Sequence, residues 1–256
     1  MFTNYDLKKQ AKSYVRGDNF GTAIKLSIIL IIYQIGTAIR SNREAISGAI
    51  DQTANNSDNA AIQYSSELAG NALPIFTEIF TTSLLSEVIL GVFTLGVTWT
   101  FVQWHRQKEA PERPVRASFK FWSKRTIVDI VVLLGLRFIF TILWTFVFII
   151  PGIMKTYSYS QAPLLYAEDV RAGREISSLT AYLKKSEKMM RGYRMKLFWL
   201  QVSFILWWIF VAITYGIAAI FVVPYYQATL AQFYLAVRKG ESGRRPTMRF
   251  DENDEL

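Results

Sequence analysis

Three charged side chains lie inside long apolar stretches of the sequence and away from the cytoplasmic ends of those stretches, and they are the first candidates for chemistry. They are Glu87, Arg137 and Lys155. A charge at the centre of a bilayer costs about 2.5–3.5 kcal/mol on insertion scales, so each such residue needs a partner or a function. Arg137 and Lys155 flank a turn expected near residues 144–146, which places two like charges at similar depth. They repel each other unless a carboxylate or another anion joins them.

Two interpretations of these charges follow from the residue types. In the first, Glu87 is the only carboxylate expected in the outer half of the spans, and it forms an ion pair with Arg137 that fixes helix register. In the second, the two cations join polar side chains in a site for an anion or a phosphate headgroup, made of Arg137, Lys155, Tyr157, Tyr159 and Gln227. The residues alone allow both.

Catalytic residues are scarce in this sequence. The chain has no Cys and a single His, His105. This excludes thiol nucleophiles, Cys-ligated metals and any site that needs two imidazoles. No HExxH, GxSxG or Walker sequence occurs, and Asp129 is the only Asp in an apolar stretch. We therefore expect a protein that is not an enzyme and that binds no cofactor and no metal.

The apolar stretches that carry these residues predict the fold. Of the 256 residues, 51% are hydrophobic and 19% are charged, whereas a soluble domain has about 25% charged residues. A membrane span needs about 20 apolar residues, and runs such as 204–213 (FILWWIFVAI) lack the polar face of a soluble helix. We expect one all-α membrane domain with six transmembrane helices at about 22–39, 84–104, 126–144, 147–167, 196–215 and 217–237.

The distribution of charge predicts the orientation. Most of the 29 Lys and Arg residues fall in 1–21, 105–125, 168–196 and 238–256. The charged residues of 41–83 are instead one Arg and five acids. Positive residues prefer the cytoplasmic side, so we expect both termini in the cytoplasm, an outer loop at 41–83 and a cytoplasmic tail at 238–256. The location expected is the bacterial plasma membrane. The same rule explains the net charge of +9, so we expect no nucleic-acid partner.

The six spans read as three hairpins that form an internal repeat. A basic, aromatic and amphipathic stretch introduces each hairpin, at 8–26, 116–125 and 184–198. We expect these stretches to form cytoplasmic helices on the anionic inner leaflet, where each Lys or Arg contributes about 1 kcal/mol. The expected partners are therefore membrane lipids, with protein partners or a homo-oligomer as further possibilities.

Spans four and six share a proline followed by a polar turn. They read FIIPGIMKTYSYSQA and FVVPYYQATLAQF, with Pro151 and Pro224 about a turn and a half into each helix. A proline inside a helix removes one backbone hydrogen bond and kinks the helix. In one interpretation these two broken helices form the walls of a binding site, as in transporters built from repeats. They are equally typical of membrane helices held together by Tyr, Ser and Gln side chains.

Three motifs carry a family resemblance: ILWTFVFIIPGIMKTYSYSQAPLLYAED (142–169), SEKMMRGYRMKLFWLQVSF (186–204) and IFVVPYYQATLAQFY (220–234). Over 91–237 the chain resembles an uncharacterised integral membrane family, a domain of unknown function found mainly in Gram-positive bacteria. It is more distantly similar to the membrane domain that precedes some glycerophosphodiester phosphodiesterases. The resemblance implies a six-helix bundle in a bacterial plasma membrane and supplies no activity. The chain departs from the family pattern at Val170 and Ala181.

Two functional hypotheses remain. In the first, the protein is a non-enzymatic membrane interaction or envelope-homeostasis factor that recruits partners or lipids through its basic inner face. In the second, it is a small transporter or exporter subunit for an anionic solute or lipid, with a site between spans three, four and six. A polar cavity among these spans would favour the second hypothesis, and a sealed bundle would favour the first.

Overall fold

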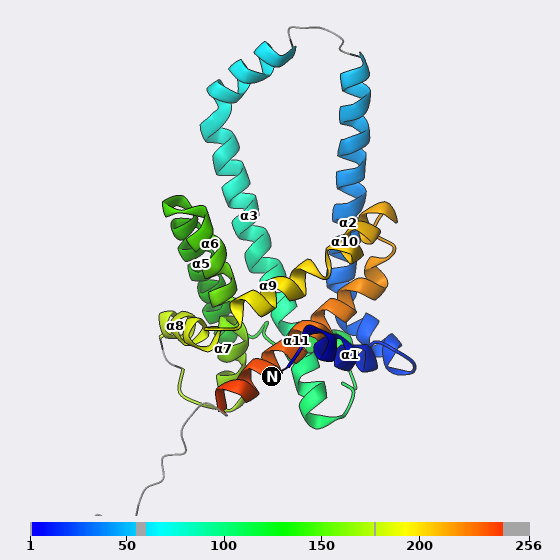
Figure 1. Ribbon diagram of the computed structural model, residues 1–256, viewed down its shortest axis with the longest axis vertical. Helices are drawn as coiled ribbons and strands as arrows, with labels where there is room; N and C mark the ends of the chain where they lie inside the picture. Colours follow the sequence, from blue (N-terminus) through cyan, green and yellow to red (C-terminus); the bar gives the residue numbers. More distant parts are fainter. Residues whose placement is uncertain (1, 55–59, 177, 243–256) are drawn as a thin grey trace, which may run out of the picture.

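The computed structural model describes residues 2–54, 60–176 and 178–242, and every regular element in them is a helix (Figure 1). In chain order these are α1 (Asn4–Tyr14), α2 (Asn19–Ala54), α3 (Ala60–Gln107), α4 (Pro114–Ser118), α5 (Lys124–Val147), α6 (Ile149–Tyr159), α7 (Ala162–Arg171), α8 (Leu179–Met189), α9 (Arg194–Val202), α10 (Ile205–Ile213) and α11 (Ala219–Ser242). The all-helical class predicted from the sequence is confirmed for this part of the chain.

Five stretches are long and apolar enough to cross a membrane. They are Asn19–Gly48 in α2, Leu84–Gln107 in α3, Thr126–Phe146 in α5, Arg194–Ile213 in α9 and α10, and Ala219–Gly240 in α11. Each coincides with one of the predicted spans. By length and composition the chain is therefore a membrane-protein candidate with five such stretches.

The stretch predicted as the fourth span, 147–167, is divided between two short helices. α6 has 11 residues and α7 has 10, with Ser160 and Gln161 between them. At about 1.5 Å per residue, α6 is about 16 Å long, which is about half of the hydrocarbon thickness. A sixth continuous spanning helix is therefore not seen. The turn before α6 is at Phe148, later than the expected 144–146.

The two predicted proline kinks differ in the structure. Pro151 is the third residue of α6, where a backbone N–H has no helical partner in any case, so it sits at the start of the helix and does not kink it. The break in this region instead precedes Pro163, in the first turn of α7. Pro224 lies inside α11, which continues past it as one helix. Because one proline begins a helix and the other lies inside one, the internal repeat stays a prediction.

The predicted outer loop and cytoplasmic tail also differ in part. α2 runs through to Ala54 and α3 begins at Ala60, so most of 41–83 is helical and not a loop. Residues 55–59 of that loop lie outside the described residues. α11 continues through Ser242 into the predicted tail, and 243–256 lie outside the described residues.

The interior is organised around α11, which packs against α1, α2 and α3 and crosses the molecule obliquely (Figure 1). Trp99 of α3, Tyr166 of α7 and Tyr234 of α11 are among its largest fully buried side chains. α4 lies close against α3 at Gly96, where an added Cβ would be 2.2 Å from the Ser118 carbonyl oxygen. This glycine permits a close approach that no larger residue allows.

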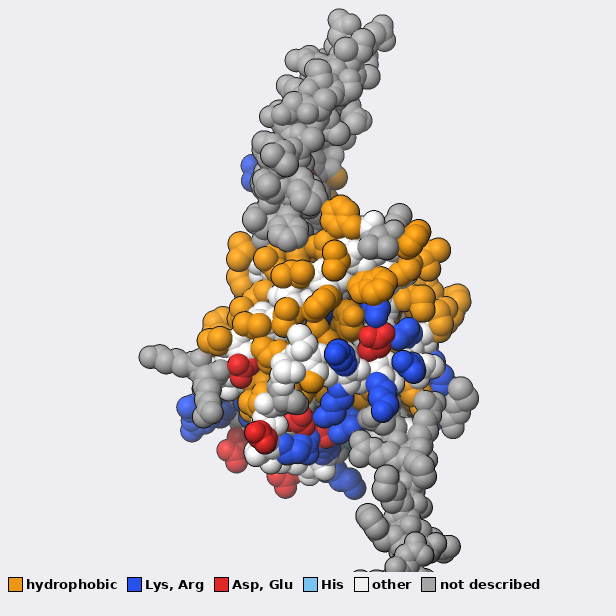
Figure 2. Space-filling model, turned by 90° about the vertical axis from the view of Figure 1, so that its left-hand side faces the viewer, with side chains coloured by type: hydrophobic (Ala, Val, Ile, Leu, Met, Phe, Trp, Pro, Cys, Tyr) orange, Lys and Arg blue, Asp and Glu red, His pale blue; other side chains and the backbone are white. Residues whose placement is uncertain are grey.

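The surface separates apolar and charged side chains. Figure 2 shows hydrophobic side chains over the middle of one face and Lys and Arg toward its lower end. Large apolar side chains that are more than half exposed include Phe146, Ile150, Leu206, Ile213 and Ile217. Contiguous apolar surface of this kind indicates contact with lipid or with another protein.

Candidate functional site

A polar cavity of about 380 Å³ lies between α3, α5, α9 and α11, beside the break between α6 and α7. We call it the central cavity. Its volume falls in the range of small-molecule sites. Two charged side chains line it, Glu87 and Arg137, and its other polar lining residues are Ser86, Thr94, Thr98, Ser160, Gln161, Gln201, Tyr226 and Gln227. The helices thus surround a polar space and do not pack shut.

The structure brings Glu87 of α3 and Arg137 of α5 to the same side of this cavity. Arg137 Nη2 lies 3.8 Å from Glu87 Oε1, and the side chains are 22% and 36% exposed. A charge-assisted hydrogen bond between such groups is about 2.7–2.9 Å long. Neither side chain makes a hydrogen bond to any residue in the described ranges. The predicted partners are therefore neighbours, but their charges are not closed into a hydrogen-bonded pair.

The wall formed by α3, α9 and α11 carries buried amide groups. Thr98 Oγ1 donates to Gln227 Oε1 at 2.6 Å, which joins α3 to α11. Gln201 Nε2 donates to the Tyr226 hydroxyl at 3.3 Å, which joins α9 to α11. The amide nitrogen of Gln227 makes no hydrogen bond within the described part of the chain. This wall is therefore held in place by its own bonds while it keeps an unused donor.

Gln161 occupies the break between α6 and α7 and also lines the cavity. Its backbone N–H donates to Ser186 Oγ at 3.2 Å, and Ser186 Oγ donates to the Ser158 carbonyl at 2.6 Å. Its side-chain Nε2 donates to Ser160 Oγ at 2.9 Å. Its Oε1 is buried and has no hydrogen-bond donor among the residues described. A buried acceptor without a donor is costly, so this atom is available to a ligand or to water.

Lys155 does not line the central cavity. Its Nζ lies 2.7 Å from Glu187 Oε1 of α8 and sits over the rings of Trp144, at 4.9 Å, and Tyr159, at 5.4 Å. The expectation that Lys155 shares a site with Arg137 is therefore not met, because its side chain turns toward α8. Its charge joins α5, α6 and α8.

Tyr157 and Tyr159 are also away from the central cavity. Tyr157 packs edge-on against Phe198 of α9 and lines a separate apolar groove with Ile153, Met154, Met195 and other residues of α6 and α9. Tyr159 is buried. Of the five residues predicted as one site, the structure places only Arg137 and Gln227 in the cavity.

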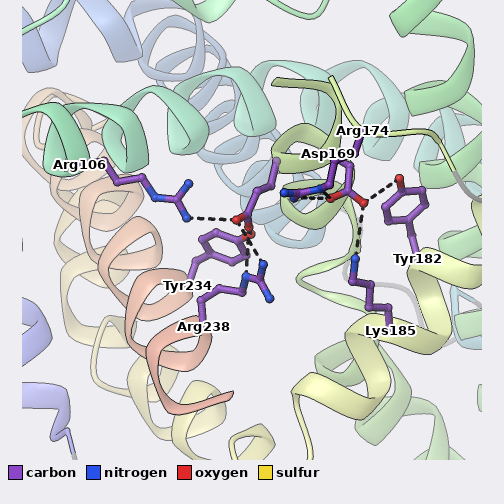
Figure 3. Close-up of polar contacts among 8 residues, drawn as sticks. Arg106, Asp169, Arg174, Tyr182, Lys185, Tyr234 and Arg238 are labelled. Atoms are coloured by element: carbon purple, nitrogen blue, oxygen red, sulfur yellow. Dashed lines mark hydrogen bonds and ion pairs between the residues drawn. The ribbon is translucent and has the colours of Figure 1, made fainter. Parts of the chain in front are cut away.

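A second set of charges surrounds Glu168 in α7, and Figure 3 shows its arrangement. Glu168 accepts hydrogen bonds from Arg238 Nε at 3.1 Å and Nη2 at 3.2 Å, and from the Tyr234 hydroxyl. Arg106 Nη2 lies 3.4 Å from the same carboxylate. We call these four residues the Glu168 cluster. It joins α7 to α3 and α11.

The next residue, Asp169, is held in a different direction (Figure 3). It accepts from Arg174 Nε at 2.8 Å and from the Tyr182 hydroxyl at 3.0 Å, and Lys185 Nζ lies at 3.5 Å. We call these four residues the Asp169 cluster. It ties α7 to α8 and to the segment between them, so two consecutive acids fix α7 on two sides.

Both carboxyl groups have lowered pKa values. Burial alone would raise the pKa of Glu168, but hydrogen bonds from Arg238 and Tyr234 and the nearby guanidinium charges outweigh it and hold the pKa below its usual 4.5. Burial likewise opposes ionisation of Asp169, and the bonds from Arg174 and Tyr182 with the charge of Lys185 lower its pKa below 3.8. Both groups are therefore ionised at neutral pH.

Sequence reasoning missed both clusters and treated Glu168 and Asp169 as the acidic end of a motif. The available signal was two adjacent acids at the end of an apolar stretch, followed by many Lys and Arg residues. Acids at a buried helix end need cationic partners. Which cations supply them depends on the folding of α3, α8 and α11 around α7.

His105 at the end of α3 lies in a second polar region. Its Nδ1 is 2.8 Å from the Tyr14 hydroxyl and 3.1 Å from Gln232 Nε2, and it lines a cavity of about 790 Å³ beside α1 and α11. It therefore helps to join α1 to the helix bundle. In the described residues, no group of three or more His, Cys, Asp and Glu side chains could hold a metal ion.

The comparisons with known proteins bear on α6 to α11. Residues 145–241 match the family model described as a protein of unknown function, DUF975. No curated protein and no solved structure matches the chain.

The matched segment contains some of the residues described above and leaves out others. Gln161, Gln227, Glu168 and Asp169 lie within it, whereas Glu87 and Arg137 lie outside. The central cavity is thus formed between the matched segment and residues of α3 and α5 that precede it. The predicted similarity to phosphodiesterase membrane domains and the Gram-positive distribution stay predictions.

Proposed function

We propose that this chain is a multi-pass protein of the bacterial plasma membrane and a small transporter or exporter subunit. Its central cavity binds the anionic group of a solute or of a lipid headgroup. The observation that carries this proposal is a polar cavity with Arg137 on its lining, within helices whose outer surface is apolar. A guanidinium in such a place is a default binding-site hypothesis.

The proposed topology has six crossings, with α6 and α7 together forming the fourth. Residues 149–167 of α6 and α7 amount to about 28 Å at about 1.5 Å per residue, close to the hydrocarbon thickness, and leave Glu168 and Asp169 outside the crossing. An even number of crossings leaves both termini on one side. The gathering of Lys and Arg toward one end (Figure 2) supports placing that end in the cytoplasm.

The break between α6 and α7 supports a transport role. Broken backbone at membrane depth is tolerated where it is buried in protein or lines a water-filled cavity. Transporters place their substrate sites at such discontinuous helices. Here Gln161 lies at the break and its unpaired Oε1 belongs to the lining of the cavity.

The alternative is a non-enzymatic membrane interaction or envelope-homeostasis factor. The observation that favours it is a basic and aromatic surface after α4. Phe119 and Trp122 are exposed beside Arg116 and Lys120. Such a surface suits an anionic leaflet or an acidic protein partner. A second copy of this chain is a further partner of this kind.

Native mass spectrometry of the full chain from mild detergent tests the proposal. We expect a bound anionic lipid or small anion in the wild type, its loss in Arg137→Leu and its retention in Lys155→Met. The Lys155→Met variant is the matched control because it also removes a membrane-zone cation, but one outside the cavity. An adduct that survives in Arg137→Leu contradicts the proposal. A co-purifying protein without any such adduct supports the interaction factor instead.

A further inference from the structure

The central cavity carries both signs of charge, and this narrows the ligand beyond an anion. We infer that it takes a zwitterionic ligand with an ammonium group and an anionic group close together. The anionic group binds Arg137, and the ammonium binds Glu87 and the Oε1 of Gln161. This inference rests on the proposed function and specifies the ligand of the same site.

The first argument is the separation of the two charges. The 3.8 Å between Arg137 and Glu87 exceeds hydrogen-bonding distance. The other ion pairs in the described residues are all shorter, with distances such as 2.7 Å between Lys155 and Glu187 and up to 3.6 Å between Arg194 and Glu187. An ion pair whose only role is to lock helix register gains most at short range, since attraction in a low dielectric rises steeply as the distance falls. Glu87 and Arg137 instead both keep hydrogen-bonding capacity at the cavity surface.

The second argument is charge balance. A simple anion at Arg137 would place its charge close to Glu87, and a simple cation at Glu87 would be close to Arg137. Like charges repel strongly where water is scarce. A ligand that carries both charges pairs each residue with its opposite and leaves the net charge of the cavity unchanged. The same two residues therefore select for a zwitterion and against either single ion.

The third argument comes from the neutral groups on the lining. The buried Gln161 Oε1 is an acceptor without a donor in the described chain, and an ammonium has three N–H donors. The only described side-chain hydrogen bond of Gln227 is the one that its Oε1 accepts. Its amide nitrogen is therefore a donor from which an anionic group of the ligand accepts. The cavity thus offers a neutral acceptor and a neutral donor besides its two charges.

Two sources of ligand share this chemistry. A cavity of about 380 Å³ has room for the phosphoethanolamine headgroup of a membrane lipid or for a free amino acid. Both combine an ammonium with an anionic group a few bonds away, since the carboxylate carbon of an amino acid is two bonds from the nitrogen and the phosphorus of phosphoethanolamine is four bonds from it. The experiment therefore includes a soluble and a lipid form of the ligand.

The test measures binding to the purified full chain of inorganic phosphate, soluble phosphoethanolamine in the form of its charge-balanced glycerol diester, glycine, and phosphatidylethanolamine or phosphatidylglycerol in nanodiscs. We expect the wild type to bind the zwitterion at least about tenfold more tightly than the matched anion, either among the soluble probes or among the lipids. We expect Glu87→Gln to lose that preference while still binding phosphate or phosphatidylglycerol. Arg137→Gln should lose binding of all probes.

Glu187→Gln is the matched control, since it removes a paired glutamate outside the cavity and should keep the preference. Thermal unfolding of each variant separates loss of binding from loss of fold. Equal binding of zwitterion and anion by the wild type, or a preference that survives in Glu87→Gln, overturns the inference but leaves the proposed function in place. No binding of any probe to the folded wild type overturns both.

Discussion

In the Glu168 cluster, a carboxylate accepts hydrogen bonds from Arg238 and Tyr234 and has Arg106 at 3.4 Å. In the central cavity, Glu87 faces one guanidinium at 3.8 Å and makes no hydrogen bond within the described residues. Both sites are glutamate beside arginine on packed helices. The difference is how completely the carboxylate is satisfied. A saturated carboxylate stabilises the fold, whereas an unsaturated one remains available to a ligand.

The two sites also join the helices differently. The Glu168 and Asp169 clusters hold the C-terminal end of α7 against α3, α8 and α11, two turns after the break at Gln161. A broken helix gains no support from continuous backbone hydrogen bonds across the break, so its second half depends on side chains. The clusters therefore hold the end of α7, whose first turn borders the cavity, and at the break itself the bond from the Gln161 backbone N–H to Ser186 Oγ adds to this support.

The largest expected effect is on the Glu168 side of this comparison. Glu168→Gln removes the negative charge that pairs with Arg106 and Arg238 and leaves two partly buried cations without it. We expect the free energy of unfolding to fall by about 2–3 kcal/mol, as for loss of a hydrogen-bonded charge. Chemical unfolding in detergent, followed by tryptophan fluorescence, measures it. Glu175→Gln is the control, because Glu175 is exposed; an equal loss there would remove the distinction between the two sites.

The next effect is on pH dependence. The folded-state pKa values of Glu168 and Asp169 lie below 4.5 and 3.8, so these groups bind protons more weakly when folded than when unfolded. The stability that they contribute is complete above those usual values and is lost as the pH falls below them, through the lowered pKa values. We expect the melting temperature to fall on acidification below about pH 4.5 and to fall less in a Glu168→Gln, Asp169→Asn variant. Parallel wild-type and variant profiles would contradict this.

Much of the helical arrangement follows from the sequence because apolar runs and unpaired charges are strong signals. Four of the five stretches long enough to span were predicted within about three residues, and the first continues to Gly48, beyond its predicted end at 39. The fourth span was predicted as one helix because hydropathy ignores the backbone. Pro163, the second residue of α7, was the available sign of the break, since proline is favoured in the first turn of a helix. The kink predicted at Pro151 is wrong, because this residue lies in the first turn of α6.

The candidate site was predicted only in part, for a related reason. Glu87 and Arg137 were matched because few charges occur in apolar stretches, so a partner can be found by elimination. Lys155 could not be placed in this way. Its partner Glu187 lies in α8, a segment that charge alone assigns to the inner surface, and the direction of a side chain around its helix depends on packing.

A smaller effect is expected in the coupling energies of the two glutamate–arginine pairs, which double-mutant cycles measure directly. We expect a coupling energy of about 2 kcal/mol between Glu168 and Arg238, which are hydrogen-bonded. Between Glu87 and Arg137 we expect less than about 1 kcal/mol, because their charges are 3.8 Å apart and partly exposed.

Arg137→Leu alone should destabilise the fold, and adding Glu87→Leu should restore part of that loss. If the double variant is no more stable than Arg137→Leu, the two residues are not a pair. Equal coupling at both pairs would contradict the contrast between them.

The smallest expected effect on stability is that of Lys155→Met. This variant tests whether a cation in the membrane zone, but outside the cavity, contributes to ligand binding. Lys155→Met removes the contact to Glu187 at 2.7 Å and the cation over Trp144, while the Met side chain keeps much of the apolar stem. We expect the free energy of unfolding to fall by about 0.5–1 kcal/mol. Binding of phosphoethanolamine and phosphate should stay within about twofold of the wild type, since a twofold change is well below 1 kcal/mol. A variant that keeps its fold but loses binding would place Lys155 in the site after all and would make the region between α5 and α6 the place to search for the ligand.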